Sequence, residues 1–314
     1  MAKLKDKIEN GLNDVRILIL GAQVLIGAGF RLFFEADFDF LPVSTQRTQL
    51  VGLAVMLLGM GPLLLPPAYH RIVNNGEDSA DLKELINLSL SFGLLPFAIG
   101  LATVFFMSGE KVLGRAAGWA FALAAGGLAL LMWYGIEFVK GRRAKKHMIR
   151  KQEEQEEREH RQNGGTPITE KIKQVLMELR MVLPGSQALL GFQFVIILMQ
   201  NFDKLPPVSR FMHLASLSAV AISTVFLITP AAYHRIVERG EDSERFHNFA
   251  GRLLLLAMFF LALGLAGDFY VITRKISGSI TVAAWAAAVL FLFFCGLWFG
   301  YCWWKRYSLA EEAA

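Results

Sequence analysis

The segment Tyr69-His70-Arg71-Ile72-Val73 occurs twice in this chain, because Tyr233-His234-Arg235-Ile236-Val237 repeats it 164 positions later. The match extends into the next turn, where Gly76-Glu77-Asp78-Ser79 corresponds to Gly240-Glu241-Asp242-Ser243. Nine of the eleven residues in 69–79 are identical to their counterparts in 233–243. Self-similarity at a fixed spacing indicates an internal duplication, so the chain is predicted to contain two copies of one structural unit.

The same shift also aligns the sequence that precedes this segment. It pairs Ile8, Leu12, Arg16, Gly21, Gln23, Leu25 and Gly27 with Ile172, Leu176, Arg180, Gly185, Gln187, Leu189 and Gly191. Asp14 pairs with Glu178, which keeps the negative charge. The predicted organisation is a first four-helix repeat over residues 1–140, a charged linker over 141–168 and a second four-helix repeat over 169–314.

Each repeat contains four apolar runs, and each run is near the ~20 residues that a helix needs to cross a bilayer. The runs cover roughly residues 17–34, 50–65, 85–107 and 116–139, then 181–199, 211–229, 249–272 and 280–304. The chain is 54% hydrophobic and only 19% charged, against about 25% charged in soluble domains. Backbone groups in lipid must pair internally, so the predicted fold is all-α and transmembrane, with eight helices. The second run of each repeat is expected to extend toward its Tyr-His-Arg segment.

The direction of each repeat follows from the number of its crossings. Four crossings return the chain to its starting side, which predicts parallel repeats around a pseudo-two-fold axis along the membrane normal. Basic residues precede the first run and follow the fourth and eighth runs: Lys3, Lys5, Lys7, Arg16, Lys140, Arg142, Arg143, Lys145, Lys146, Arg150, Lys151, Lys305 and Arg306. The positive-inside rule therefore predicts a multi-pass protein of the plasma (inner) membrane with both termini in the cytoplasm. Lys111, Arg115, Arg274 and Lys275 run against this rule.

The net charge of +5 is interpreted as membrane topology rather than nucleic-acid binding. The expected partner is the lipid bilayer, with a contact to anionic lipid at the cytoplasmic face as a minor alternative for the linker. A homo-oligomer in which several chains surround a central pore is an open alternative.

The repeated Tyr-His-Arg segment is the first candidate for function. Its members are Tyr69, His70, Arg71, Tyr233, His234 and Arg235, and each copy follows a proline, at Pro66 or Pro230. Histidine can relay protons near neutral pH, and arginine can hold an anion. The alternative is interfacial anchoring, with tyrosine at the headgroups, arginine on lipid phosphate and histidine on a nearby carbonyl.

Two further repeated sets lie on the first helix of each repeat. Asp14 with Arg16, and Glu178 with Arg180, are expected beside the Tyr-His-Arg segment of their own repeat, as a structural ion-pair belt or as the mouth of a pathway. Gln23 and Gln187 are flanked by glycines that allow close helix approach. They are expected either to form interhelical hydrogen bonds or to line a pathway.

The remaining polar residues are interpreted as structural. Ser79 or Asp78 is a plausible helix cap, and His213, Glu137, Asp268 and His247, which have no repeat partner, are expected to be boundary or packing residues. Cys295 and Cys302 lie about two helical turns apart, which is too far for a disulfide. The sequence contains nothing that resembles a phosphate-binding loop, a zinc-metalloprotease helix, a serine-hydrolase elbow or a paired zinc motif. Paired histidines at a membrane interface do not suit haem. We therefore expect no enzymatic activity, no cofactor and no metal.

Each repeat resembles an uncharacterised bacterial family of small four-helix membrane proteins. The resemblance rests on Met177-Glu178-Leu179-Arg180, Pro184-Gly185-Ser186-Gln187 and Pro230-Ala231-Ala232-Tyr233-His234-Arg235. The first repeat departs from it, with Leu20 in place of Pro184 and Pro67 in place of Ala231. The resemblance covers nearly the whole chain and implies the fold and the importance of the motifs, but it implies no activity.

Two functions follow as hypotheses. The first is an ion channel or small-solute transporter, with Gln23 and Gln187 along the path and the Tyr-His-Arg segments at its cytoplasmic mouth. The second is a non-transporting scaffold, assembly factor or lipid-binding sensor. A channel needs polar lining across both leaflets, whereas the polar residues singled out in this sequence lie mainly on the cytoplasmic side.

Overall fold

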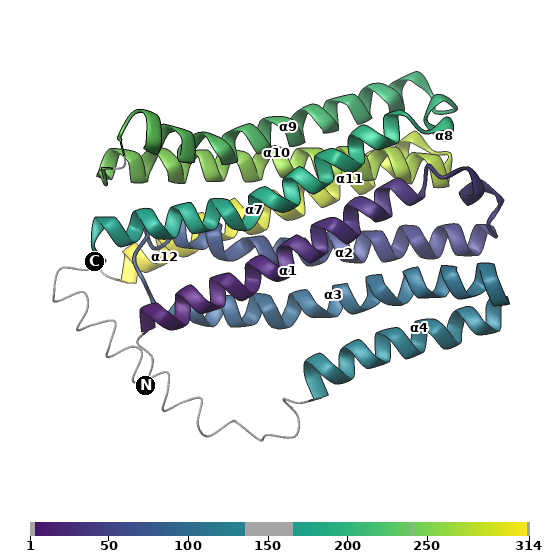
Figure 1. Ribbon diagram of the computed structural model, residues 1–314, viewed down its shortest axis with the longest axis horizontal. Coiled ribbons are helices and arrows are strands. Elements are labelled where there is room, and N and C mark those ends of the chain that lie inside the picture. The colour runs from purple at the N-terminus through teal and green to yellow at the C-terminus, as the bar shows by residue number, and fades with distance from the viewer. Residues whose placement is uncertain (1–3, 136–165, 240, 313–314) are drawn as a thin grey trace.

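The computed structural model describes residues 4–135, 166–239 and 241–312, and these ranges form helices and turns without any strand (Figure 1). The first repeat comprises α1 (Leu4–Leu32), η1 (Ala36–Phe40), α2 (Val43–Ile72), α3 (Ala80–Leu113), α4 (Arg115–Leu130) and η2 (Leu131–Gly135). The second comprises α7 (Ile168–Ile197), α8 (Gln200–Asp203), α9 (Pro207–Ile236), α10 (Glu244–Ser277), α11 (Ile280–Cys295), η3 (Gly296–Tyr301) and α12 (Cys302–Glu312). Glu137 and most of the predicted linker lie outside the described residues.

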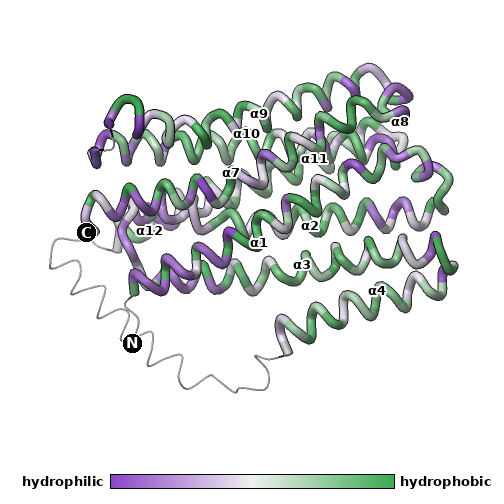
Figure 2. Tube along the Cα trace, viewed as in Figure 1, coloured by the Kyte–Doolittle hydropathy of each residue, from purple (hydrophilic) through white to green (hydrophobic). Residues whose placement is uncertain are grey.

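Eight helical segments are long and apolar enough to cross a membrane, as the sequence predicts. Helices α4 and α11 continue through the π-helical segments η2 and η3, so each forms one span with its continuation. Figure 2 shows hydrophobic residues along most of the length of the long helices. The chain is therefore an integral membrane protein.

The predicted extension of the second run in each repeat is also confirmed. Helix α2 contains Pro62, Pro66 and Pro67 and ends at Ile72, so its Tyr-His-Arg segment forms its last turns. Helix α9 contains Pro230 and ends at Ile236 in the same way. These helices place each motif at the end of a membrane-spanning segment.

Serine caps begin the third helix of each repeat. The Ser79 hydroxyl accepts a hydrogen bond from the Leu82 amide at 3.0 Å, and the Ser243 hydroxyl accepts one from the Phe246 amide at 3.1 Å. Such caps satisfy one of the amide donors left unpaired at a helix start. The predicted cap at Ser79 is confirmed, whereas Asp78 accepts a hydrogen bond from the Gln174 amide at 2.9 Å.

The bundle has two distinct ends. Helices α1 and α7 begin at the end that carries both chain termini, here named the terminal end, and η1 and α8 lie at the other, here named the loop end (Figure 1). Helices α1 and α7 pack against each other in the centre, whereas α4 and α9 lie at opposite edges (Figure 1).

The two repeats have different neighbours. Helix α2 is covered by η3 and α12 of the second repeat: the Trp298 indole donates to the Gly61 carbonyl at 2.8 Å, and Tyr301 stacks on Tyr69 with ring centroids 6.5 Å apart. In the described residues, α9 packs mainly on α10 and α7 and leaves its outer face open. The two repeats thus contain equivalent helices, but these helices pack against different neighbours.

Candidate functional site

A buried charge cluster joins the two repeats near the terminal end. It consists of His70 and Arg71 at the end of α2, Glu178 on α7 and His247 on α10. Both His70 and Glu178 are fully buried, and Arg71 is only 7% exposed. Burial at this depth requires partners, because an unpaired ion in an apolar interior costs several kcal/mol.

The Glu178 carboxylate is the centre of the cluster. Arg71 approaches it with one edge of its guanidinium group, Nε lying 2.7 Å from Oε2 and Nη2 donating to Oε1 at 3.0 Å. The His70 Nδ1 atom meets the same Oε1 atom. Of the two Arg71 contacts, only that from Nη2 is a hydrogen bond, whereas Nε and Oε2 are close but have no hydrogen-bond partner among the described residues. A hydrogen bond between two charged groups is stronger than one between neutral groups.

The rest of the cluster closes around Arg71. Its Nη1 atom donates to His247 Nε2 at 2.7 Å. Gly76 lies against the cluster in the left-handed conformation, with φ +81°, and a Cβ there would fall 2.8 Å from the His247 Nε2 atom. Glycine suits this position because the turn needs a positive φ and leaves no room for a side chain. The second imidazole nitrogen of His70 is buried and has no hydrogen-bond partner among the described residues.

The expectation that each acid pairs within its own repeat is wrong for this cluster. Glu178 of the second repeat reaches the His-Arg pair of the first, whereas Asp14, its counterpart, is exposed. The packing of α1 against α7 brings the second-repeat acid to α2. Arg16 is half-buried and Arg180 is exposed, and neither joins the described cluster.

The second Tyr-His-Arg segment has a more open environment. Tyr233 and His234 are half-buried and Arg235 is exposed. His234 lies 3.5 Å from Asp242, and its ring contacts Phe246 with centroids 4.7 Å apart. The motif therefore forms a buried cluster in one copy only.

The glutamine pair is also asymmetric. Gln23 is fully buried, and its amide atoms have no hydrogen-bond partner in the described part of the chain. It packs so closely on Gly185 of α7 that a Cβ at that glycine would overlap the Gln23 side chain. Gln187 is exposed, so it does not pair with Gln23 across the bundle.

A second buried polar cluster lies toward the loop end. His213 Nδ1 is 3.0 Å from the Asp268 carboxylate, and the Gln193 amide donates to the other oxygen of Asp268 at 2.5 Å. His213 Nε2 also lies 3.1 Å from the Gln193 carbonyl oxygen. All three residues are at most 3% exposed. The packing role expected for His213 and Asp268 therefore understates their position, since each is an ionisable group held inside a membrane bundle.

Two of these residues had no repeat signal to reveal them. His213 corresponds to Gln49, which donates to the Thr103 carbonyl at 2.6 Å, and Asp268 corresponds to Val104. The one available signal was an acid within an apolar run, which marks a functional candidate in membrane helices. His247 corresponds to Lys83 and was missed for the same reason.

Helix α7 connects these groups along one buried face. Glu178, Ser186 and Gln193 are at most 2% exposed, and Gln23 packs beside Ser186 at the neighbouring Gly185. Their spacing of seven or eight residues keeps them on one side of a helix. The fifteen residues from Glu178 to Gln193 rise about 22 Å, which is most of the ~30 Å hydrocarbon core. Buried polar groups thus occur at both ends and in the middle of the bundle.

The comparisons with known proteins identify a family but no activity. A family model described as "Family of unknown function (DUF6328)" matches residues 2–137 and again residues 155–302. The chain belongs to this family. Two matches in tandem agree with the internal duplication. No curated protein matches the chain, and no solved structure does.

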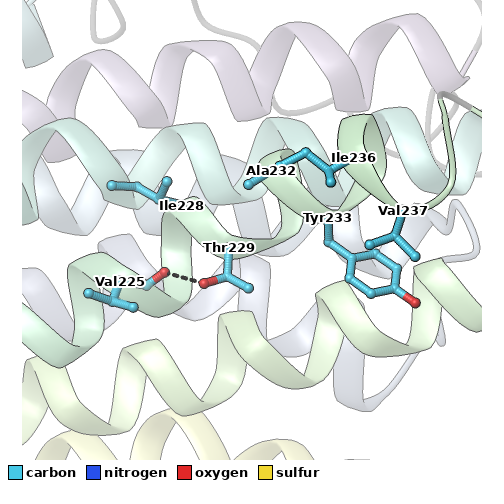
Figure 3. A pocket seen from close by; sticks show the side chains of 7 residues that line it. All are labelled: Val225, Ile228, Thr229, Ala232, Tyr233, Ile236 and Val237. Atoms are coloured by element: carbon cyan, nitrogen blue, oxygen red, sulfur yellow. Dashed lines mark hydrogen bonds between the residues drawn. The ribbon is translucent and has the colours of Figure 1, made fainter.

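This DUF6328 protein also has an open apolar groove on α9, beside its second Tyr-His-Arg segment. Figure 3 shows the seven side chains that line it: Val225, Ile228, Thr229, Ala232, Tyr233, Ile236 and Val237. The groove has a volume of about 350 Å³. Its counterpart on α2 includes Gly61 and Tyr69, which η3 covers. No group of three metal-ligating side chains occurs among the described residues.

Proposed function

We propose that this protein is a transporter or channel that moves protons, or ions or small solutes together with protons, along the polar face of α7. The observation that carries the proposal is the series of buried polar groups Glu178, Gln23 with Ser186, and Gln193 with His213 and Asp268. Ionisable groups inside a membrane bundle are costly and typically mark ion or proton pathways. A path across both leaflets needs polar side chains toward the loop end as well. The buried cluster of Gln193, His213 and Asp268 provides them there.

The terminal-end cluster is proposed to be the proton-binding site of the pathway. Glu178 shares its carboxylate between Arg71 and His70, so a proton that moves between acid and imidazole changes the strength of the ion pair. The unpartnered Nε2 of His70 offers a second position for a proton or a water molecule. Histidine is the residue type whose charge changes most readily near neutral pH.

We propose that both repeats cross the plasma (inner) membrane in the same direction, around an axis along the membrane normal, with both termini in the cytoplasm. The basic residues near the terminal end support this orientation. At the loop end, Lys111 lies 2.8 Å from Asp37, and Lys275 pairs with Asp39. These acids offset two of the cations that run against the positive-inside rule. We propose no enzymatic activity and no nucleic-acid partner.

Ion flux into liposomes that contain the purified protein tests this function. Wild-type protein is compared with Glu178→Gln under imposed proton, potassium, sodium and chloride gradients. We expect proton flux above that of empty liposomes and a reduction of at least tenfold in Glu178→Gln. Asp14→Asn is the matched control, because it removes the repeat counterpart of Glu178 from an exposed position and should leave the flux unchanged.

A second variant separates loss of transport from loss of folding. Gln23→Leu removes the amide in the middle of the series without leaving a buried charge unpaired, and the side chains are similar in size. We expect it to reduce flux while the protein keeps its elution volume in detergent. Flux equal to that of empty liposomes for folded wild-type protein, under every gradient, would exclude transport of these ions.

The groove on α9 favours assembly as a second candidate function. The equivalent face of α2 is covered by η3. We therefore propose that a helix from a second copy of the chain covers the groove on α9. The alternative occupant is lipid. Ala232→Trp would fill the groove. Native mass spectrometry should show oligomers of wild-type protein that Ala232→Trp reduces to monomers, whereas monomeric wild-type protein would leave lipid as the occupant.

A further inference from the structure

A polar pocket at the loop end is formed by both repeats. It has a volume of about 290 Å³, and its lining includes Asp39 from the first repeat and Asn201, Lys204, Ser209, Arg274 and Lys275 from the second. The pocket lies between the connection from α1 to α2, the connection from α7 to α9, and the end of α10. This volume suits a small solute rather than a polypeptide.

The charges in the pocket leave a positive excess. Lys204, Arg274 and Lys275 supply three cations against one carboxylate, Asp39, which Lys275 already engages. The Lys204 ammonium donates to the Asn201 side-chain oxygen at 2.7 Å, and Arg274 donates to the Tyr270 hydroxyl at 3.2 Å. Within the described ranges, Arg274 and Lys204 have no carboxylate partner. Two positive charges therefore remain available to a ligand.

Ser209 adds a polar group that no protein atom satisfies. It lines the pocket and is 1% exposed, and its hydroxyl has no hydrogen-bond partner among the described residues. Most buried hydroxyl groups in proteins are hydrogen-bonded. A hydroxyl that lines the same pocket as two cations without carboxylate partners is a suitable donor for an oxygen of an anion. Ser209 also lies one helical turn before His213 on α9, so the pocket is directly followed by the buried His213–Asp268 pair.

The position of Arg274 and Lys275 at the loop end also favours a bound anion. Arg274 and Lys275 lie at the end of the bundle that the positive-inside rule would keep poor in basic residues. Asp39 offsets Lys275, whereas Arg274 has no such offset. A bound anion would supply the missing negative charge.

We propose that this pocket binds a small oxyanion, such as inorganic phosphate, sulfate or a short carboxylate, through Arg274, Lys204 and the Ser209 hydroxyl. The planar guanidinium group of Arg274 can donate two parallel hydrogen bonds to such an anion, and Lys204 acts as a point charge. A phospholipid headgroup offers the same chemistry as free phosphate. We also infer that a small oxyanion is the substrate of the proposed transport. This part of the inference rests on the proposed function, whereas the anion site itself does not.

Isothermal titration of the full-length protein in maltoside detergent tests the site. Phosphate, sulfate and acetate are titrated separately at constant ionic strength. We expect saturable binding of at least one anion, weakened at least tenfold in Arg274→Gln and severalfold in Ser209→Ala. Arg210→Gln is the matched control, because Arg210 is an exposed cation next to Ser209 that does not line this pocket. Its binding constant should remain that of the wild-type protein.

Native mass spectrometry distinguishes a lipid from a free anion. Phospholipid that co-purifies with the wild-type protein and is lost in Arg274→Gln would assign the oxyanion to a headgroup. The proposal would be overturned if neither saturable anion binding nor such a lipid were found, or if Arg210→Gln weakened anion binding as much as Arg274→Gln. The binding experiments need no gradient, so they are independent of the flux assay. Anion binding without flux would support the anion site and exclude the proposed transport. Proton flux without anion binding would support transport and exclude the anion site.

Discussion

The two Tyr-His-Arg segments have the same sequence and different surroundings. On α2 the histidine and arginine are buried around Glu178, and Tyr69 is covered by Tyr301. On α9 the arginine is exposed and Tyr233 borders an open groove. The difference arises from neighbouring helices rather than from the motif, because α7 and η3 of the second repeat both pack on the first. A duplicated motif can therefore keep one copy as a buried site and expose the other.

The largest effect is expected from breaking the buried ion pair. Glu178→Gln leaves the Arg71 guanidinium without its carboxylate, and removal of one partner of a buried pair typically costs on the order of 3–5 kcal/mol. Asp14→Asn changes the exposed counterpart and should alter the free energy of unfolding by no more than about 0.5 kcal/mol. Unfolding in detergent by titration with sodium dodecyl sulfate measures both. Equal losses in the two variants would contradict the cross-repeat pairing.

A smaller effect is expected from the glycines that the repeat makes equivalent. Gly185→Ala places a methyl group where the Gln23 side chain lies, including a Gln23 Cβ that would be only 2.8 Å away. We expect a loss of about 1–3 kcal/mol from overpacking. Gly21→Ala meets only the Phe97 ring, at 3.4 Å, and should be neutral or stabilising by up to about 1 kcal/mol, since alanine favours helix.

The reason for the Gly185 effect can be tested with a second substitution. Gln23→Ala shortens the side chain that the new methyl group would overlap, so the double variant should recover part of the stability lost in Gly185→Ala. The same denaturation assay measures this coupling. Additive losses would show that Gly185 is required for a reason other than contact with Gln23.

The sequence was sufficient to predict the eight helices, because the signals for each helix are local. Apolar runs of membrane length and serine caps each depend on residues close together in the chain. The motif repeat, 164 positions apart, indicated that both halves contain the same helices. The eight helices, the cap at Ser79 and the extension of α2 through its prolines followed from these signals.

The candidate site could be predicted only in part, because it depends on which helices meet. The duplication identified Glu178, His70 and Arg71 as candidates. It did not indicate whether Asp14 or Glu178 would pair with His70 and Arg71. His213, Asp268 and His247 lack a repeat counterpart of the same kind, so their clusters were visible only once α9 and α10 were packed on their neighbours. The pairing of Glu178 with the first repeat and the clusters around these three residues are thus set by tertiary contacts rather than by local sequence pattern.

The smallest effect is expected in the turn after each motif, where it appears as a dependence on pH. Glu77 is paired with Lys171 and accepts a hydrogen bond from the Thr166 amide at 2.8 Å, whereas its counterpart Glu241 is exposed. Partial burial acts to raise the pKa of Glu77, but these partners outweigh it and hold the pKa below its usual 4.5. An acid with a lowered pKa stabilises the fold above its unfolded value and loses that contribution as pH falls through the folded value.

Glu77→Gln should therefore reduce stability at neutral pH by no more than about 1 kcal/mol, as expected for a partly exposed ion pair. It should also remove part of the acid destabilisation that wild-type protein shows below the usual pKa of glutamate, whereas Glu241→Gln should follow the wild-type profile. Unfolding midpoints at neutral pH and below 4.5 compare the three proteins. If Glu241→Gln changed the profile as much as Glu77→Gln, the two turns would be equivalent in solution, and the asymmetry of the repeats would not extend beyond the buried cluster.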